Sequence, residues 1–107
     1  MPRTIVTKSP VSEGVSRRFF LSIETLVNAG QVNSLESFCN ANKLSPPRYR
    51  AMRLEYGVSP KPGYVSAYKN VEIEAIFALV ANFPVSAGWL ITGRGEMLTR
   101  KLKAPAK

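Results

Sequence analysis

Three arginines, Arg48, Arg50 and Arg53, lie close together in the segment LSPPRYRAMR of residues 44–53. A guanidinium group is planar and donates two parallel hydrogen bonds, and this fork matches the O6 and N7 atoms of guanine as well as phosphate oxygens. One such contact to guanine contributes about 1–3 kcal/mol of discrimination between bases. The segment therefore favours a role in nucleic-acid recognition. The simpler alternative is that these arginines lie on a solvated helix face and keep the chain soluble.

Two prolines in the same segment predict the start of a helix rather than its end. Pro46 and Pro47 follow Ser45, a residue type that caps helices. Proline is tolerated in a first helical turn because the N–H groups there have no acceptor within the helix. We therefore expect a helix over residues 46–56 that ends at Gly57.

The two sides of this predicted helix differ in character. At about 100° per residue, the side that we expect to pack in the core consists of Tyr49, Met52 and Tyr56. The outer side consists of Pro46, Pro47, Arg50, Ala51, Arg53 and Leu54. Its arginines stand between small or rigid residues, so this side could enter a major groove. Arg48 falls at the flank, where we expect it to contact a backbone phosphate.

A shorter helix is predicted just before this one, over residues 35–42, with Asn33 or Ser34 as its cap. Two helices joined by a short turn, the second with exposed arginines, are the elements of a helix-turn-helix, whose second helix enters the major groove of DNA. Helix N-termini and turn lysines bind phosphates. We therefore expect backbone contacts from Ser34, Lys43 and Ser45.

The rest of the chain predicts three more helices and so an all-α fold of five. Their expected ranges are about 16–29, 71 or 72 to 82, and 86–93. The apolar side chains expected in the core are Ile73, Ile76, Phe77 and Val80 of the fourth helix, with Leu79 alongside, and Trp89 and Leu90 of the fifth. We expect residues 1–15 to form a flexible arm, residues 16–98 the domain, and residues 99–107 a basic tail.

The composition restricts the classes of function. The chain has 107 residues, enough for one small domain, and a formal net charge of +8, which suits a polyanionic partner. It has no histidine and one cysteine, Cys39, so it lacks the usual general base, an intrachain disulfide and a Cys/His zinc site. Glu72 and Glu74, the one close pair of carboxylates, would point in nearly opposite directions on a helix. We therefore predict no enzymatic activity, no cofactor, no metal and no small-molecule substrate.

No apolar run is long enough to cross a bilayer, and no signal peptide is visible. We therefore predict a cytoplasmic protein with no membrane partner. Cys39 lies among apolar residues, and we expect it to be a small buried hydrophobe rather than a reactive thiol.

Two segments resemble a known family. SLESFCNANKLSPPRYRAMR is similar to the helix-turn-helix of lambda-repressor-like (Cro/xenobiotic-response-element type) regulators. WLITGRGEML resembles the segment that closes this domain in many such regulators of Bacteroidetes and their phages. The resemblance covers about residues 16–98 and implies a five-helix lambda-repressor-like DNA-binding domain that acts as a transcriptional regulator, typically a repressor, and as a homodimer on double-stranded DNA.

The same resemblance assigns roles to individual positions. It implies that the residues facing DNA are Ser45, Pro46, Pro47, Arg50, Ala51 and Leu54, and that the buried ones are Phe38, Cys39, Leu44, Tyr49 and Met52. Two positions depart from the family pattern: Lys43 replaces the usual turn glycine, and Asn42 replaces an apolar residue. A left-handed turn at Lys43 would carry a conformational cost.

An alternative function is a protein-interaction module, such as a phage adaptor or an antitoxin-like partner, that keeps the fold without specific DNA reading. The departures at residues 42 and 43 favour it slightly. If the chain forms a dimer, we expect the fifth helix and residues 89–98 to make the interface.

Overall fold

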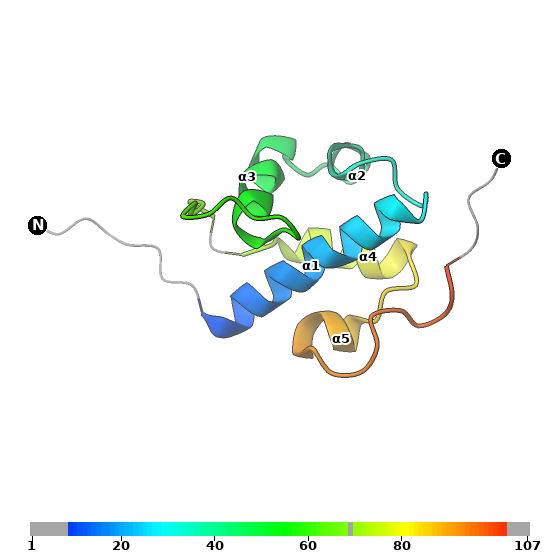
Figure 1. The fold of residues 1–107 in the computed structure, drawn as a ribbon. Coiled ribbons are helices and arrows are strands. Elements are labelled where there is room, and N and C mark those ends of the chain that lie inside the picture. Colours follow the sequence, from blue (N-terminus) through cyan, green and yellow to red (C-terminus); the bar gives the residue numbers. More distant parts are fainter. Residues whose placement is uncertain (1–8, 69, 103–107) are drawn as a thin grey trace, which may run out of the picture.

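The computed structural model describes residues 9–68 and 70–102, and these residues form five helices and no strand. The helices are α1 (Pro10–Asn28), α2 (Leu35–Ala41), α3 (Pro46–Tyr56), α4 (Ile73–Asn82) and α5 (Ala87–Thr92). Helix α1 runs through the middle of the molecule, with α2 and α3 on one side and α5 on the other (Figure 1). The predicted all-α class is confirmed. No helix in the described part of the chain is long and apolar enough to cross a membrane.

Aromatic side chains hold the centre of the fold together. Phe19 of α1 packs edge-on against Phe20 and Phe38, and its ring centroid lies 5.8 Å from that of Tyr49 in α3. All four side chains are buried, and aromatic pairs at such distances contribute about 0.5–1.5 kcal/mol each beyond the burial of their area. This cluster fixes α2 and α3 against α1.

Helix α1 begins six residues earlier than the sequence predicted. It starts at Pro10, and the hydroxyl of Ser9 caps it by accepting a hydrogen bond from the N–H of Ser12 at 3.0 Å. Residues 10–15, which were assigned to the flexible arm, are therefore helical, and the prediction was wrong there. A serine followed by proline starts α1 for the same reason that Ser45 and Pro46 start α3. Residues 1–8 lie outside the described part.

Helix α4 turns a different face to the core than predicted. The exposed fractions of Ile73 and Phe77 are 68% and 71%, whereas Ala75, Ala78 and Leu79 are buried. Because α4 is apolar on nearly all sides, periodicity alone could not choose its core face. The prediction was therefore wrong for Ile73 and Phe77, while Ile76 and Val80 are partly buried.

The chain after α5 folds back and closes the domain. Gly93 adopts a left-handed conformation (φ 78°) that ends α5. The N–H of Ser86 then donates to the carbonyl of Met97, and the N–H of Thr99 donates to that of Pro84, both at 2.8 Å. Leu90 anchors α5 in the core as predicted, whereas Trp89 is only partly buried. Thr99 therefore belongs to the folded domain, and of the predicted tail, residues 103–107 lie outside the described part.

Arg18 ties α1 to the end of α5. Its Nε donates to the carbonyl of Leu90 at 2.8 Å and its Nη2 to that of Ile91 at 3.0 Å. These carbonyls lie in the last turn of α5, where a cation is favoured by the helix dipole. Gly93 packs against the guanidinium, since a Cβ there would lie 3.0 Å from Nη1.

Replacing Arg18 with alanine should lower the free energy of unfolding by about 2 kcal/mol, because two charge-assisted hydrogen bonds to helix carbonyls are lost. Urea unfolding followed by circular dichroism measures this change. The neighbouring Arg17→Ala is the control: Arg17 is exposed and lies over the Tyr56 ring, so its loss should cost at most about 1 kcal/mol. Equal effects of the two substitutions would contradict the assigned role of Arg18.

The turn between α2 and α3 is left-handed at Lys43, whose φ is 59°. Lys43 is the one residue other than glycine with a positive φ among those described. Asn42 stabilises this end of α2, because its side-chain amide donates to the carbonyl of Phe38 at 2.8 Å. The departures from the family pattern at residues 42 and 43 therefore leave a tight turn in place.

Lys43→Gly should raise the free energy of unfolding by about 0.5–1 kcal/mol. Glycine removes the roughly 1–2 kcal/mol cost of a left-handed L-residue and loses part of that gain to the entropy of the unfolded chain. Urea unfolding again provides the measurement. Lys61→Gly, at an exposed loop lysine without positive φ, should give no gain. A Lys43→Gly protein that is no more stable than the parent would show that the turn is not strained.

Candidate nucleic-acid interface

Helix α3 presents its arginines to solvent because its other side is locked into the core. Tyr49 and Met52 are fully buried, and Tyr56 is 2% exposed. Arg50 and Arg53 are exposed, and Leu54 beside them is 40% exposed. The two sides of α3 predicted from the sequence are confirmed, as are its bounds and its cap.

The remaining predicted contact residues surround this exposed side. Ser34, Lys43, Ser45 and Pro47 are exposed, while Pro46 and Ala51 are partly buried. The Ser34 hydroxyl accepts from the N–H of Ser37 at 3.0 Å, and the Ser45 hydroxyl accepts from that of Arg48 at 3.5 Å. Because each serine uses its oxygen as an acceptor, its O–H remains able to donate outward. The structure thus brings Ser34, Lys43 and Ser45 to the N-terminal ends of α2 and α3.

Arg48 does not extend freely from the flank of α3. Its Nη2 donates to the carbonyl of Asn70 at 3.1 Å, and its guanidinium lies 4.8 Å from the centre of the Tyr68 ring. Its Nε is 3.9 Å from the Glu72 carboxylate. These contacts to the end of the α3–α4 connection hold the cation in place. Arg48 therefore anchors that connection, and its contact with a backbone phosphate stays a prediction.

Tyr49 links the inner side of α3 to the start of α4. Its hydroxyl donates to the Glu72 carboxylate at 3.0 Å and accepts from the Glu72 N–H at 3.1 Å. Burial raises the pKa of Tyr49 well above its usual value, so its hydroxyl remains protonated. The same carboxylate faces Arg48. Glu72 thus links the start of α4 to the inner side of α3.

The α3–α4 connection is fastened to α3 at a second place. The Glu55 carboxylate accepts from both the N–H and the hydroxyl of Ser66, at 2.9 and 3.0 Å. The N–H of Lys61 donates to the carbonyl of Leu54 at 2.7 Å. Glu55 therefore holds this loop. These bonds keep the connection in a defined position beside the end of α3.

Two charged side chains that the sequence did not place lie near α3, one beside its C-terminal end and one on its exposed side. Arg17 of α1 lies over the Tyr56 ring at 5.4 Å, which places an exposed cation beside the C-terminal end of α3. Glu36 of α2 lies 3.4 Å from Arg50, so a carboxylate borders the exposed side. The basic pair at residues 17 and 18 was visible in the sequence, but nothing in it placed either residue near α3.

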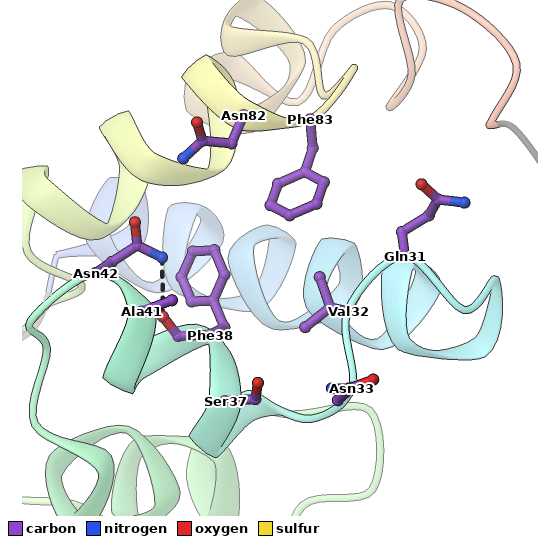
Figure 2. Close-up of a pocket in the computed structure, with 9 residues that line it drawn as sticks. All are labelled: Gln31, Val32, Asn33, Ser37, Phe38, Ala41, Asn42, Asn82 and Phe83. Atoms are coloured by element: carbon purple, nitrogen blue, oxygen red, sulfur yellow. Dashed lines mark hydrogen bonds between the residues drawn. The ribbon is translucent and has the colours of Figure 1, made fainter. Parts of the chain in front are cut away.

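A hollow lies elsewhere, between the α1–α2 connection, α2 and the end of α4 (Figure 2). Its volume is about 400 Å³, and the rings of Phe38 and Phe83, with centroids 6.3 Å apart, lie within it. None of its nine lining residues is ionisable, so the hollow contains no ionisable acid, base or nucleophile. Within the described residues, no three His, Cys, Asp or Glu side chains cluster closely enough to hold a metal.

Cys39 is buried on the inner side of α2, as the sequence predicted. Burial raises the pKa of its thiol to about 11, which keeps it protonated and therefore a poor nucleophile at neutral pH.

Comparison with known proteins identifies no relative: no family profile, curated protein or solved structure matches the chain.

Proposed function

We propose that this protein is a sequence-specific DNA-binding regulator of transcription, with a lambda-repressor-like helix-turn-helix that reads the major groove through α3. The observation that carries the proposal is the division of α3, whose inner side is locked by Tyr49 and Met52 while Arg50 and Arg53 remain exposed. A rigid helix with two outward guanidinium forks has the chemistry needed to recognise guanine. Repression is the regulatory role that we propose for it.

Backbone contacts in this proposal come from groups around the ends of α2 and α3. Lys43, in the turn before α3, and Arg17, beside the Tyr56 ring at the other end of α3, supply exposed cations. Because the first two residues of α3 are prolines and the Arg48 N–H is bonded to Ser45, the hydrogen-bond donor at this helix end is the Ser45 hydroxyl. A single module reads few base pairs, so we propose that a homodimer binds a palindromic site.

Selection of bound sequences from a random pool of duplex DNA tests the proposal directly. The selected sequences should share a motif that contains guanine, and fluorescence anisotropy should show tighter binding to it than to a scrambled duplex. With about four phosphate contacts, affinity should fall on the order of a hundredfold between 50 and 200 mM salt. No enriched motif, together with no salt-dependent binding, would refute the function.

A second candidate function, a protein-interaction module, is favoured by the outer side of α4. Ile73 and Phe77, four residues apart, are both mostly exposed there, next to a hollow of about 350 Å³. Exposed apolar patches of this kind mark contact surfaces on many proteins. This side could serve a protein partner whether or not α3 binds DNA.

Ile73→Ser with Phe77→Ser should leave the free energy of unfolding within about 1 kcal/mol of the parent, because both side chains are mostly exposed. Leu79→Ala, in the core of the same helix, should cost about 2–5 kcal/mol. If the double variant keeps full DNA affinity, the α4 surface is not needed for DNA reading. If it loses DNA affinity while α3 substitutions have no effect, DNA binds at the α4 surface and not at α3. If the parent protein binds no DNA at all, the interaction-module hypothesis replaces the one above.

A further inference from the structure

Glu36 and Arg50 form an ion pair that bridges the two helices of the proposed DNA-binding unit. The Oε2 atom of Glu36, the second residue of α2, lies 3.4 Å from Nη1 of Arg50 in α3. Their side chains are 58% and 46% exposed, respectively. Exposed ion pairs of this type add little to stability, since solvent screens them and their long side chains lose entropy. Its main consequence is therefore a restriction on where the Arg50 guanidinium can point.

The position of Glu36 is unfavourable for general attraction to DNA. A carboxylate at the border of the proposed interface repels phosphates and opposes the positive charge of Arg50 and Lys43. The first turn of a helix favours an acidic residue, which accounts for Glu36 as part of α2. That preference does not account for its contact with α3. The contact is what distinguishes Glu36 from an ordinary first-turn acid.

An arginine on a surface near DNA has two competing kinds of partner. Its flexible side chain can reach a nearby phosphate, which carries no sequence information, or a base edge, which does. A carboxylate that holds Nη1 restricts the rotamers of Arg50 and keeps the guanidinium over the face shared by α2 and α3. The other guanidinium N–H groups remain available, because an arginine has five donors.

We infer that Glu36 is a positioning residue that directs Arg50 toward a guanine and away from phosphates, so that it raises sequence discrimination at the expense of overall DNA affinity. The second carboxylate oxygen of Glu36 remains an acceptor and suits an exocyclic amino group, such as cytosine N4, in the neighbouring base pair. This inference rests on the proposed DNA-binding function and adds to it a determinant of specificity that lies outside α3.

Glu36→Gln is the appropriate test, because it keeps the size of the side chain and removes its charge. Affinities are measured by fluorescence anisotropy for the selected duplex, for a duplex in which the guanine assigned to Arg50 is replaced, and for a scrambled duplex. We expect the variant to bind the scrambled duplex several-fold more tightly, since one repulsive charge is gone. We also expect the preference for guanine at that position to fall a few-fold, which is the most that an exposed ion pair can contribute.

Glu24→Gln provides the matched control. Glu24 is an exposed acid of α1 that lines a hollow together with Arg53 and Leu54, so it too borders the outer side of α3. Its neutralisation should also strengthen binding to scrambled DNA but should leave the guanine preference intact. Thermal melts of both variants verify that the helices are preserved.

A double-mutant cycle separates positioning from general electrostatics. In an Arg50→Ala background, Glu36→Gln should cause no further loss of guanine preference, because there is no longer an arginine to direct. If Glu36→Gln behaves like Glu24→Gln, or if its effect on preference persists without Arg50, the inference is wrong although the DNA-binding function stands. If the parent protein prefers no sequence at all, it is the proposed function that fails.

Discussion

Replacing both Arg50 and Arg53 with alanine should lower the affinity for the selected DNA about a hundredfold or more while the fold stays intact. Each bidentate arginine–guanine contact contributes about 1–3 kcal/mol, and both would be lost. Stability should change little, because both side chains are exposed. Fluorescence anisotropy with selected and scrambled duplexes measures the effect, and the difference between the two duplexes should nearly disappear.

The control for this prediction removes the same amount of charge from another surface. Arg94 and Arg100 are exposed and lie in the segment after α5, away from α3 in the sequence. Arg94→Ala with Arg100→Ala should weaken binding to all duplexes modestly and leave the sequence preference in place. If the two double variants lose equal DNA affinity, α3 contributes only charge. If the α3 variant keeps its affinity unchanged, DNA binds elsewhere.

Met52→Asp should leave the domain largely unfolded. Met52 is completely buried between α3 and the core, and an ionised carboxylate there would have no partner. Such substitutions cost more than about 4 kcal/mol, which is most of the stability of a small domain. Circular dichroism should show the loss of helical signal and of the cooperative thermal transition.

Leu54→Asp makes the same substitution two residues further along the helix and should have the opposite pattern of effects. Leu54 is 40% exposed on the outer side of α3, so the folded state tolerates a charge there. The new carboxylate would face phosphates, and DNA binding should be lost although the melting curve remains cooperative. A folded Met52→Asp protein, or a Leu54→Asp protein that binds DNA normally, would contradict the assigned sides of α3.

The sequence predicted α3 best because its signals are local. A serine cap, two prolines and a glycine define its ends, and three large apolar residues at helical spacing define its inner side. For α4 the same reasoning was insufficient. Its residues are apolar on nearly every side, and only the packing of Ala75 and Ala78 against the rest of the fold determines which of them are buried.

The partners of several charged residues could not be predicted, because they come from distant parts of the chain. Arg48 is held by Asn70, 22 residues away, and Arg18 by Leu90, 72 residues away. No periodicity argument can detect such pairs. Arg50 and Arg53 were placed correctly because their exposure follows from the helix on which they lie. The Glu36–Arg50 pair, in contrast, requires the relative placement of α2 and α3.

The central claim is that the outer side of α3 contacts DNA, and nuclear magnetic resonance tests it most directly. A titration of the isotope-labelled protein with the selected duplex should shift the backbone amide signals of residues 43–54 most strongly, with smaller changes near Arg17. Signals from α4 around Ile73 and Phe77 should change little. Changes confined to α4, or no changes in residues 43–54 at saturating DNA, would contradict the account.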